Sequence, residues 1–185
     1  TIRTVAIIGA GQMGAGIAQA VAAGGYAVRL YDAAADRPPR ALASIAASLA
    51  RLVERDLTPQ AEADAVMGRI SIASGLAEAG AADLIIEAAV EDEAVKKALF
   101  AELTPHLAAH TLLASNTSSI SITRLAAATD RPDRFIGLHF MKPAPVMKLV
   151  EIIRGIATSA DTYAAAVTFA ESLGKTTTNA EDFPA

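Results

Sequence analysis

Short apolar runs alternate along the chain with longer segments in which apolar residues recur at helical spacing. The apolar runs are nearly continuous, as in VAII at residues 5–8 and LII at residues 84–86, which is typical of strands buried on both faces of a parallel sheet. Strands are predicted over residues 4–9, 27–32, 71–74, 83–88, 111–115, 135–139 and 147–152. Helices are predicted over residues 12–23, 38–55, 59–70, 93–109, 121–128 and 161–173. This alternation predicts an α/β fold of the Rossmann type, with a doubly wound, mainly parallel sheet and helices on both faces.

The length and composition of the chain indicate one large domain. Its 185 residues are enough for one sizeable core and few for two. Hydrophobic residues make up 52% of the chain and aromatic residues only 4%, a mixture that suits helices packed closely on a sheet. Polar residues and a proline follow the last predicted helix. We therefore expect residues 1–180 to form the domain and residues 181–185 to begin a linker.

Charge and cysteine content argue against several classes of protein. The formal net charge is only -4, and the 16 Lys and Arg residues are scattered, so a nucleic-acid partner is not indicated. The absence of cysteine excludes disulfides and thiolate metal sites, fits a reducing compartment, and leads us to expect no metal. The apolar start is too short for a signal peptide or a membrane span. We expect a cytoplasmic protein without a membrane partner.

The first predicted strand is followed directly by a glycine-rich motif. This G-x-G-x-x-G sequence consists of Gly9, Ala10, Gly11, Gln12, Met13 and Gly14. In a strand–turn–helix unit the first glycine allows a tight turn, the second lets the backbone approach a pyrophosphate, and the third lets helix and strand pack closely. The N–H groups at the start of the following helix attract phosphate. The motif therefore predicts a dinucleotide site formed by these six residues.

An acidic residue supports the same interpretation. The second predicted strand ends on Asp32, at about the 20-residue spacing typical of a carboxylate that binds the adenosine ribose. Asp32 would repel the 2′-phosphate of NADP, and the Ala33-Ala34-Ala35 run supplies no arginine to bind that phosphate. We therefore expect NAD as the cofactor. The alternative is a glycine turn of purely structural use, with Asp32 at a solvated strand end.

His139 is the candidate general base. It ends a predicted strand, at the edge where open α/β sheets bind their ligands, and Glu151 lies at the end of the next predicted strand. Adjacent strands would bring the imidazole and the carboxylate together. Oxidation of a secondary alcohol needs a base for the hydroxyl proton while hydride leaves, and a neutral imidazole oriented by a carboxylate suits that role. The alternatives are a structural histidine and a surface acid.

Four segments resemble one known family. They are GAGQMGAGIA at residues 9–18, IEAAVE at residues 86–91, SNTSSI at residues 115–120 and HFMKPAPVMKLVEIIRG at residues 139–155. In this order they are similar to the 3-hydroxyacyl-CoA dehydrogenases, in particular to the bacterial 3-hydroxybutyryl-CoA branch, and the likeness extends over essentially the whole chain. The resemblance implies NAD-dependent oxidation of (S)-3-hydroxyacyl-CoA to 3-oxoacyl-CoA in fatty acid or short-chain acyl-CoA metabolism, with an acyl-CoA as the partner molecule.

The resemblance also implies roles for individual residues. His139 is implied as the general base, Glu151 as its orienting partner, and Ser118 as a hydroxyl that bonds to the substrate oxygen and contacts the cofactor. Glu91 and Lys96 match residues that contact the nucleotide. The alternatives are a loop-capping role for Ser118 and a solvated, charged helix start at Glu91 and Lys96.

The resemblance further implies contacts with the CoA moiety and with a second subunit. Ser48 and Arg55 fall where the family contacts the CoA moiety, with Arg55 in place of a lysine; the alternative is an exposed helix face. Lys142 stands in the place of a family asparagine at the cofactor site and offers donors only. In the family, an Asp-x-Pro segment similar to residues 182–184 leads into a helical domain. We expect that helical dimerisation domain to be absent from this chain, and the full-length protein to be a homodimer.

Three other functions remain open from the sequence. A related dehydrogenase acting on a sugar acid such as gulonate would share the overall pattern. A non-catalytic NAD-binding module would keep the glycine motif and Asp32 but has no need for His139, Glu151 and Ser118 together. The chain also fits one module of a multifunctional fatty-acid oxidation protein.

Overall fold

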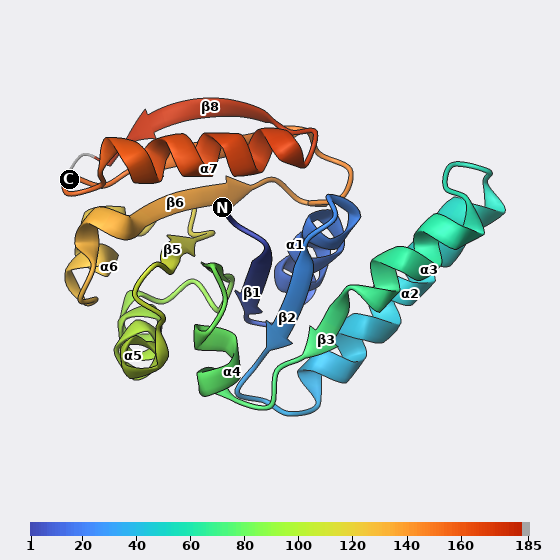
Figure 1. The fold of residues 1–185 in the computed structure, drawn as a ribbon, viewed down its shortest axis with the longest axis horizontal. Helices are drawn as coiled ribbons and strands as arrows, with labels where there is room; N and C mark the ends of the chain where they lie inside the picture. Colours follow the sequence, from blue (N-terminus) through green and yellow to red (C-terminus); the bar gives the residue numbers. More distant parts are fainter. Residues whose placement is uncertain (183–185) are drawn as a thin grey trace.

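An eight-stranded sheet with helices on both faces forms the centre of the protein in the computed structural model, which describes residues 1–182 (Figure 1). The strands are β1 (Thr4–Ile8), β2 (Ala27–Tyr31), β3 (Ile70–Ile72), β4 (Leu84–Glu87), β5 (Leu112–Ser115), β6 (Phe135–Phe140), β7 (Leu149–Arg154) and β8 (Thr176–Glu181). The helices are α1 (Gln12–Ala23), α2 (Arg37–Glu54), α3 (Gln60–Gly68), α4 (Leu76–Gly80), α5 (Glu93–Leu103), α6 (Ile122–Ala127) and α7 (Ala160–Ser172), with 3-10 turns η1 (Thr104–His106) and η2 (Pro132–Arg134).

The strand order confirms the predicted Rossmann-type sheet. The order is β3-β2-β1-β4-β5-β6-β7-β8, and the pairs from β3 through β6 are all parallel. β7 runs antiparallel to β6, and β8 runs parallel to β7. The chain leaves β1 on one side toward β2 and returns on the other side as β4, so the strand order reverses between β1 and β4. Ligands of open α/β sheets bind at such a reversal point.

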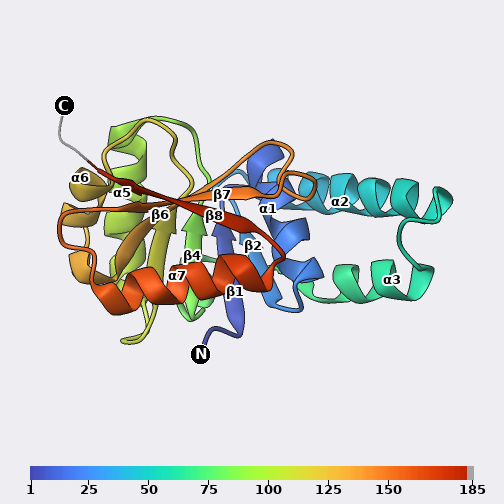
Figure 2. The ribbon, with the colours of Figure 1, turned by 90° about the horizontal axis from the view of Figure 1, so that it is seen from above.

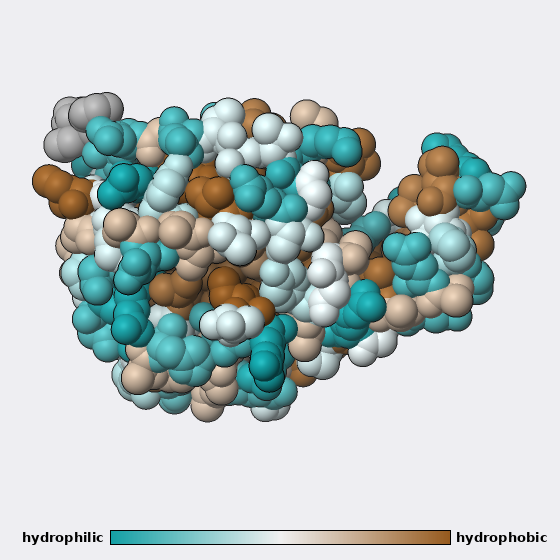
Figure 3. Space-filling model, turned by 45° about the horizontal axis from the view of Figure 1, so that its top comes forward, coloured by the Kyte–Doolittle hydropathy of each residue, from teal (hydrophilic) through white to brown (hydrophobic). Residues whose placement is uncertain are grey.

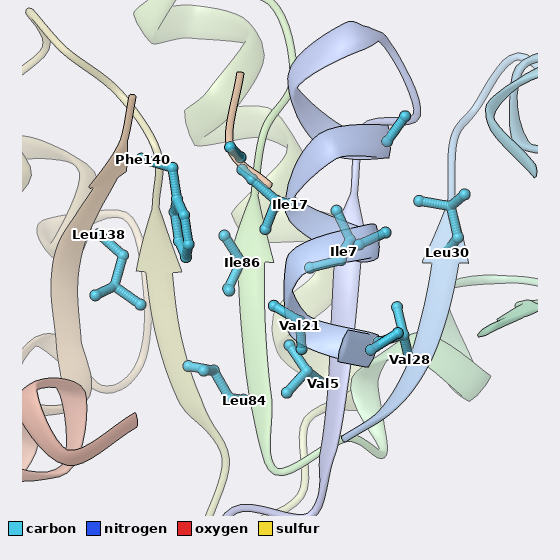
Figure 4. Packing of buried hydrophobic residues seen from close by; sticks show 14 of the residues in the cluster. Val5, Ile7, Ile17, Val21, Val28, Leu30, Leu84, Ile86, Leu138 and Phe140 are labelled. Atoms are coloured by element: carbon cyan, nitrogen blue, oxygen red, sulfur yellow. The ribbon is translucent and has the colours of Figure 1, made fainter. Parts of the chain in front are cut away.

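The alternation of side chains along β1 divides the core into two layers. Val5 and Ile7 belong to the cluster that includes residues of α1 and α7, whereas Ala6 and Ile8 belong to the cluster that includes residues of α4, α5 and α6. Figure 4 shows Ile7 beside Ile17 of α1 on the first face. Both faces of β1 are fully covered, which explains why its sequence is a continuous apolar run.

Helices α2 and α3 form a hairpin that projects from the body of the domain (Figures 1 and 2). The buried positions of α2 include Ala41, Ile45 and Leu49, at four-residue spacing on one helical face. This narrow apolar stripe holds the hairpin against the body, and most other α2 residues are exposed. In the space-filling view the hairpin is separated from the body by a notch (Figure 3). Residues of α1, α2, α3 and the α7–β8 turn line a cavity of 350 Å³ in this region.

The structure differs from the predicted elements in three notable places. Strand β8 was not predicted because its sequence, TTTNAE, is polar, and it forms through pairing with β7 at the exposed edge of the sheet. Helix α4 was not predicted because five residues are too few to show helical periodicity. The helix predicted over residues 93–109 is wrong beyond Leu103, where a 3-10 turn contains Pro105, which has no N–H for the helical ladder.

The predicted linker begins inside the sheet. Glu181 is the last residue of β8, and the Asp182 carboxylate accepts hydrogen bonds from the Ser121 hydroxyl and the Thr123 amide at the start of α6. Residues 183–185 of the predicted linker lie outside the described residues. Of the helices in residues 1–182, none is both long enough and apolar enough to cross a membrane.

Candidate active site

The glycine motif lies at the reversal point of the sheet and lines a cavity of 410 Å³. Gly9, Gly11 and Met13 contribute to its wall from the motif, Asp32 from the end of β2, and Ala88 from the end of β4. The six predicted motif residues surround the start of α1, whose N-cap residue Gly11 makes no side-chain cap hydrogen bond. The first N–H groups of α1 therefore have no side-chain cap to compete with an anionic ligand.

The three glycines of the motif meet different steric requirements. Gly9 has a φ of 107°, and a Cβ at this position would lie 2.5 Å from the Ala88 carbonyl oxygen. A Cβ on Gly14 would lie 1.7 Å from the Gly9 carbonyl oxygen. A Cβ on Gly11, in contrast, would have no heavy atom within 4 Å. The fold itself therefore requires Gly9 and Gly14, whereas the space beside Gly11 is available for a pyrophosphate.

Two alanine substitutions are expected to separate folding from cofactor binding. Gly14→Ala is expected to lower the free energy of unfolding by about 1–3 kcal/mol, because its Cβ overlaps the Gly9 carbonyl and forces the α1–β1 packing apart. Gly11→Ala is expected to leave the melting temperature nearly unchanged and to weaken NAD binding at least about tenfold. Thermal unfolding and calorimetric titration with NAD measure the two effects. Equal melting temperatures for both variants would contradict this assignment.

Two backbone hydrogen bonds hold Asp32 in place at the wall of this cavity. Its Oδ2 atom accepts a hydrogen bond from the Ala10 amide at 2.8 Å, and its Oδ1 atom accepts one from the Ala34 amide at 2.9 Å. The Ala33-Ala34-Ala35 run supplies no arginine, but α2 begins at Arg37 and places its Nη1 atom 3.7 Å from Asp32 Oδ2, a contact that the sequence did not predict. Arg37 also lines the cavity. The carboxylate and the open Gly11 face fit an adenosine ribose and a pyrophosphate, which is the requirement for NAD.

His139 and Glu151 face each other across the antiparallel pair of β6 and β7. They are register partners in the ladder, and His139 Nδ1 lies 2.9 Å from Glu151 Oε2. The side chain of His139 is 20% exposed and that of Glu151 is 40% exposed. Within residues 1–182, Nε2 of His139 makes no hydrogen bond, so this nitrogen is available to a ligand. The side chains of His139 and Glu151 thus lie close together, as expected for adjacent strands.

A second cavity, of 300 Å³, joins His139 to the dinucleotide cavity. It is lined by Met13, Ala88, Ala89, Glu91, Lys96, Asn116, Ser118, His139, Phe140, Met141 and Lys142. Met13, Ala88 and Ala89 belong to the walls of both cavities. A dinucleotide with its adenosine at Asp32 would therefore direct its other end toward His139.

Glu91 holds the loop that carries Ser118. One carboxylate oxygen accepts hydrogen bonds from the Ser118 amide at 2.9 Å, the Ser118 hydroxyl at 3.1 Å and the Thr117 hydroxyl at 2.9 Å. Burial by itself would raise the pKa of Glu91, but these donors and the nearby Lys96 ammonium together lower it below its usual value. Glu91 is therefore ionised at neutral pH and keeps the loop attached to the cavity wall.

Comparison with known proteins identifies the family of this domain. Residues 4–183 match the family described as "3-hydroxyacyl-CoA dehydrogenase, NAD binding domain". The chain belongs to the 3-hydroxyacyl-CoA dehydrogenase family. The cofactor of this domain is NAD, as the sequence predicted.

Individual relatives support the same family. The 3-hydroxybutyryl-CoA dehydrogenase of Bradyrhizobium diazoefficiens is 50% identical over 184 residues, which cover 100% of this chain and 63% of that protein. A probable 3-hydroxybutyryl-CoA dehydrogenase of Bacillus subtilis is 47% identical over 183 residues, 99% of this chain and 64% of that protein. The crystal structure of (S)-3-hydroxybutyryl-CoA dehydrogenase from Ralstonia eutropha superposes with a TM-score of 0.96 at 42% identity, covering 100% of this chain and 65% of that chain. The chain thus spans less than two thirds of the length of these relatives.

The expected CoA contacts of this 3-hydroxyacyl-CoA dehydrogenase domain lie away from His139. Ser48 sits in the middle of α2, where its hydroxyl accepts a hydrogen bond from Gln19 of α1 at 3.1 Å. Arg55 is exposed just beyond the end of α2. Neither residue lines the cavity that contains His139. Both belong to the projecting hairpin and not to the wall of the cavity that contains His139.

Two further residues lie close to His139, and the sequence predicted a role for only one of them. Lys142, expected at the cofactor site, is exposed and lines the cavity with His139. Asn116 had no predicted role, yet its Oδ1 atom accepts a hydrogen bond from the Phe140 amide at 2.8 Å. That bond ties the end of β5 to the end of β6 next to His139. The signal that points to Asn116 is its position directly after a predicted strand, beside the other ligand-binding strand ends.

Proposed function

We propose that this chain provides the cofactor-binding half and the general base of an NAD-dependent enzyme that oxidises (S)-3-hydroxyacyl-CoA to 3-oxoacyl-CoA. The observation that carries the proposal is the 2.9 Å contact between His139 and Glu151 at the wall of a cavity that adjoins the dinucleotide cavity. A binding module without catalysis has no need for an imidazole–carboxylate pair at that place. This argument favours an enzyme.

The two side chains divide the proton chemistry between them. NAD, when bound, supplies the acceptor for the hydride that leaves C3 of the substrate. His139 takes the hydroxyl proton on Nε2, because Nδ1 faces the Glu151 carboxylate. As the C–H and O–H bonds break, the alcohol carbon becomes a ketone and the imidazole becomes an imidazolium. The Glu151 carboxylate stabilises that cation and keeps the ring in the orientation that presents Nε2.

Ser118 and Lys142 complete the polar side of the cavity. The Ser118 hydroxyl donates to Glu91 at 3.1 Å, and the Ser118 amide also holds the residue on Glu91. With substrate bound, the hydroxyl would turn to donate to the substrate oxygen, whose own proton goes to His139. Lys142 offers three donors and no acceptor, so it pairs with an oxygen of the nicotinamide amide or of the substrate. Both residues act on orientation and leave the proton transfer to His139.

The names of the relatives support a short-chain acyl-CoA as the substrate class. Those with the highest identities given above are named for 3-hydroxybutyryl-CoA, a short-chain acyl-CoA, which disfavours a sugar acid. The chain spans only 63% of such a relative, and we propose that a further part of the protein forms the opposite wall of the substrate cleft and the subunit contacts of a cytoplasmic homodimer. Ser48 and Arg55 bind the CoA moiety along the projecting hairpin.

The test compares the full-length protein with residues 1–185. The full-length protein is expected to oxidise (S)-3-hydroxybutyryl-CoA with NAD, followed as NADH absorbance. Residues 1–185 are expected to bind NAD but to turn over at least about a hundredfold more slowly, because the substrate lacks half of its cleft and misplacement by about 1 Å has an effect of that size. Full-length protein without NAD-dependent oxidation of any 3-hydroxyacyl-CoA would refute the proposed function. Full activity of residues 1–185 would refute the need for a second wall.

A further inference from the structure

A fully buried ion pair lies beneath the loop that separates the two cavities. Glu87 ends β4 and is 0% exposed, and Lys96 in α5 is 1% exposed. The Lys96 ammonium lies 2.5 Å from Glu87 Oε2. Removing two charges from water has a large desolvation cost, and a buried pair of this kind is poorly explained by stability alone. Its position suggests a role in the site above it.

Every polar atom of the pair is engaged by the surrounding strands and loop. Glu87 Oε1 accepts a hydrogen bond from the Ser115 hydroxyl at 2.5 Å, and Oε2 accepts one from the Ala89 amide at 2.7 Å. The Lys96 ammonium also donates to the Ala89 carbonyl at 3.2 Å. Ala89 belongs to the wall shared by the two cavities. The pair therefore fixes that wall by binding both backbone polar groups of Ala89.

The same ammonium continues the contacts toward the catalytic cavity. Lys96 Nζ lies 3.5 Å from Glu91 Oε1, and the other oxygen of Glu91 accepts from the Ser118 amide and hydroxyl. The charges alternate from the buried carboxylate of Glu87 through the buried ammonium of Lys96 to the exposed carboxylate of Glu91. Ser118, at the end of this series, lines the cavity with His139.

We infer that Glu87 is a positioning residue that, through Lys96 and Glu91, fixes Ser118 beside His139. The inference rests on the proposed function. Without the Glu87 carboxylate, the buried ammonium would lack its nearest partner, and the cost of an unpaired buried charge would draw it to Glu91, the next carboxylate along. Glu91 would then turn toward Lys96 and release the Ser118 hydroxyl and amide. Glu87 thus acts on the reaction without touching substrate or cofactor.

The first test is catalytic and uses the full-length protein. Glu87→Gln is expected to lower kcat about tenfold at saturating NAD and substrate, an effect within the range of couplings between contacting residues of one network. In a Ser118→Ala background, the same change is expected to have almost no further effect on kcat. If the single variant does not fold, the isosteric double variant Glu87→Gln/Lys96→Met is measured in its place, because it leaves no buried charge unpaired. Thr111→Val, which removes another fully buried side-chain hydrogen bond at the opposite end of β5, is the matched control and is expected to keep its kcat.

The second test does not depend on activity. Amide hydrogen exchange at Ser118, whose N–H donates to Glu91 at 2.9 Å, is expected to accelerate about tenfold in Glu87→Gln. It is expected to accelerate in the double variant as well, because Glu91 there loses the Lys96 ammonium that holds its Oε1 atom. Exchange at Thr123, whose amide donates to Asp182 at 2.8 Å, is expected to stay unchanged. General destabilisation would accelerate both amides equally.

The outcomes separate the inference from the proposed function. Unchanged Ser118 exchange, equal acceleration at Ser118 and Thr123, or a full kcat loss that persists in the Ser118→Ala background would each overturn the positioning role of Glu87. A His139→Gln variant with unchanged kcat would instead overturn the proposed function. In that case selective acceleration at Ser118 would still establish the connection from Glu87 to Ser118.

Discussion

Replacement of His139 by glutamine in the full-length protein is expected to lower kcat by about 10²–10⁴-fold, the usual contribution of a general base. NAD affinity is expected to stay nearly unchanged, because the glycine motif and Asp32, the proposed contacts of the pyrophosphate and ribose, line a cavity whose wall does not include His139. The Gln side chain retains a polar group of similar size but cannot take up the hydroxyl proton. Steady-state oxidation of (S)-3-hydroxybutyryl-CoA at saturating NAD measures the loss.

His110 provides a matched control for this substitution. Its Nε2 atom also pairs with a carboxylate, that of Asp83 at 2.7 Å, but the pair lines a different cavity, away from the active site. His110→Gln is expected to leave kcat unchanged. Glu151→Gln is expected to lower kcat strongly, and its effect should not add to that of His139→Gln because the two residues act as one unit. A His139→Gln variant that keeps most of its kcat would show that the base lies elsewhere.

The preference for NAD over NADP is expected to fall by about 10³-fold in the variant Asp32→Ala. The Asp32 carboxylate can accept two ribose hydrogen bonds, which contribute roughly 1.5–3 kcal/mol each as bonds to a charged group, and about 1.4 kcal/mol corresponds to tenfold. Loss of the carboxylate also frees Arg37, now 3.7 Å from it, to bind a 2′-phosphate. Calorimetric titration with both dinucleotides gives the ratio.

A second substitution, at Arg37, distinguishes the two causes of the changed preference between NAD and NADP. Arg37→Ala in the Asp32→Ala background is expected to remove the gain in NADP binding while leaving the loss of NAD binding in place. Thermal unfolding is needed as a control, because Asp32 also accepts hydrogen bonds from the Ala10 and Ala34 amides that shape the turn. An Asp32→Ala variant that folds and keeps its preference for NAD would contradict the role of Asp32.

The sequence predicted those features that depend on local pattern and strand order. Continuous apolar strands, the glycine motif and Asp32 follow one another in a fixed order, so the sheet and the dinucleotide cavity were predictable. His139 and Glu151 were predicted together because they fall on consecutive predicted strands, and consecutive strands are usually neighbours. Glu151 was expected at the end of its strand, but it lies nearer the start of β7. The antiparallel register then brings the two side chains into direct contact.

Features that depend on tertiary packing were not predictable. Lys96 and Lys97 are adjacent in a charged run that is typical of a solvated helix start, yet Lys96 is 1% exposed while Lys97 lies at the surface. Only the packing of α5 against β4 decides which lysine is buried on Glu87. Arg37 escaped prediction for a similar reason, because the turn after Ala35 folds the start of α2 back toward Asp32.

The pairing of His139 with Glu151 in the β6–β7 ladder constrains which changes of chain length the site can accept. Side chains alternate between the faces of a strand, so one residue inserted within β6 or β7 would turn one partner to the other side of the sheet. Residues added to the connection over residues 141–148 leave the ladder in place. This connection nevertheless carries Lys142 on the cavity wall and lies inside the family-like segment 139–155, so related sequences should keep its length as well as the lengths of the two strands.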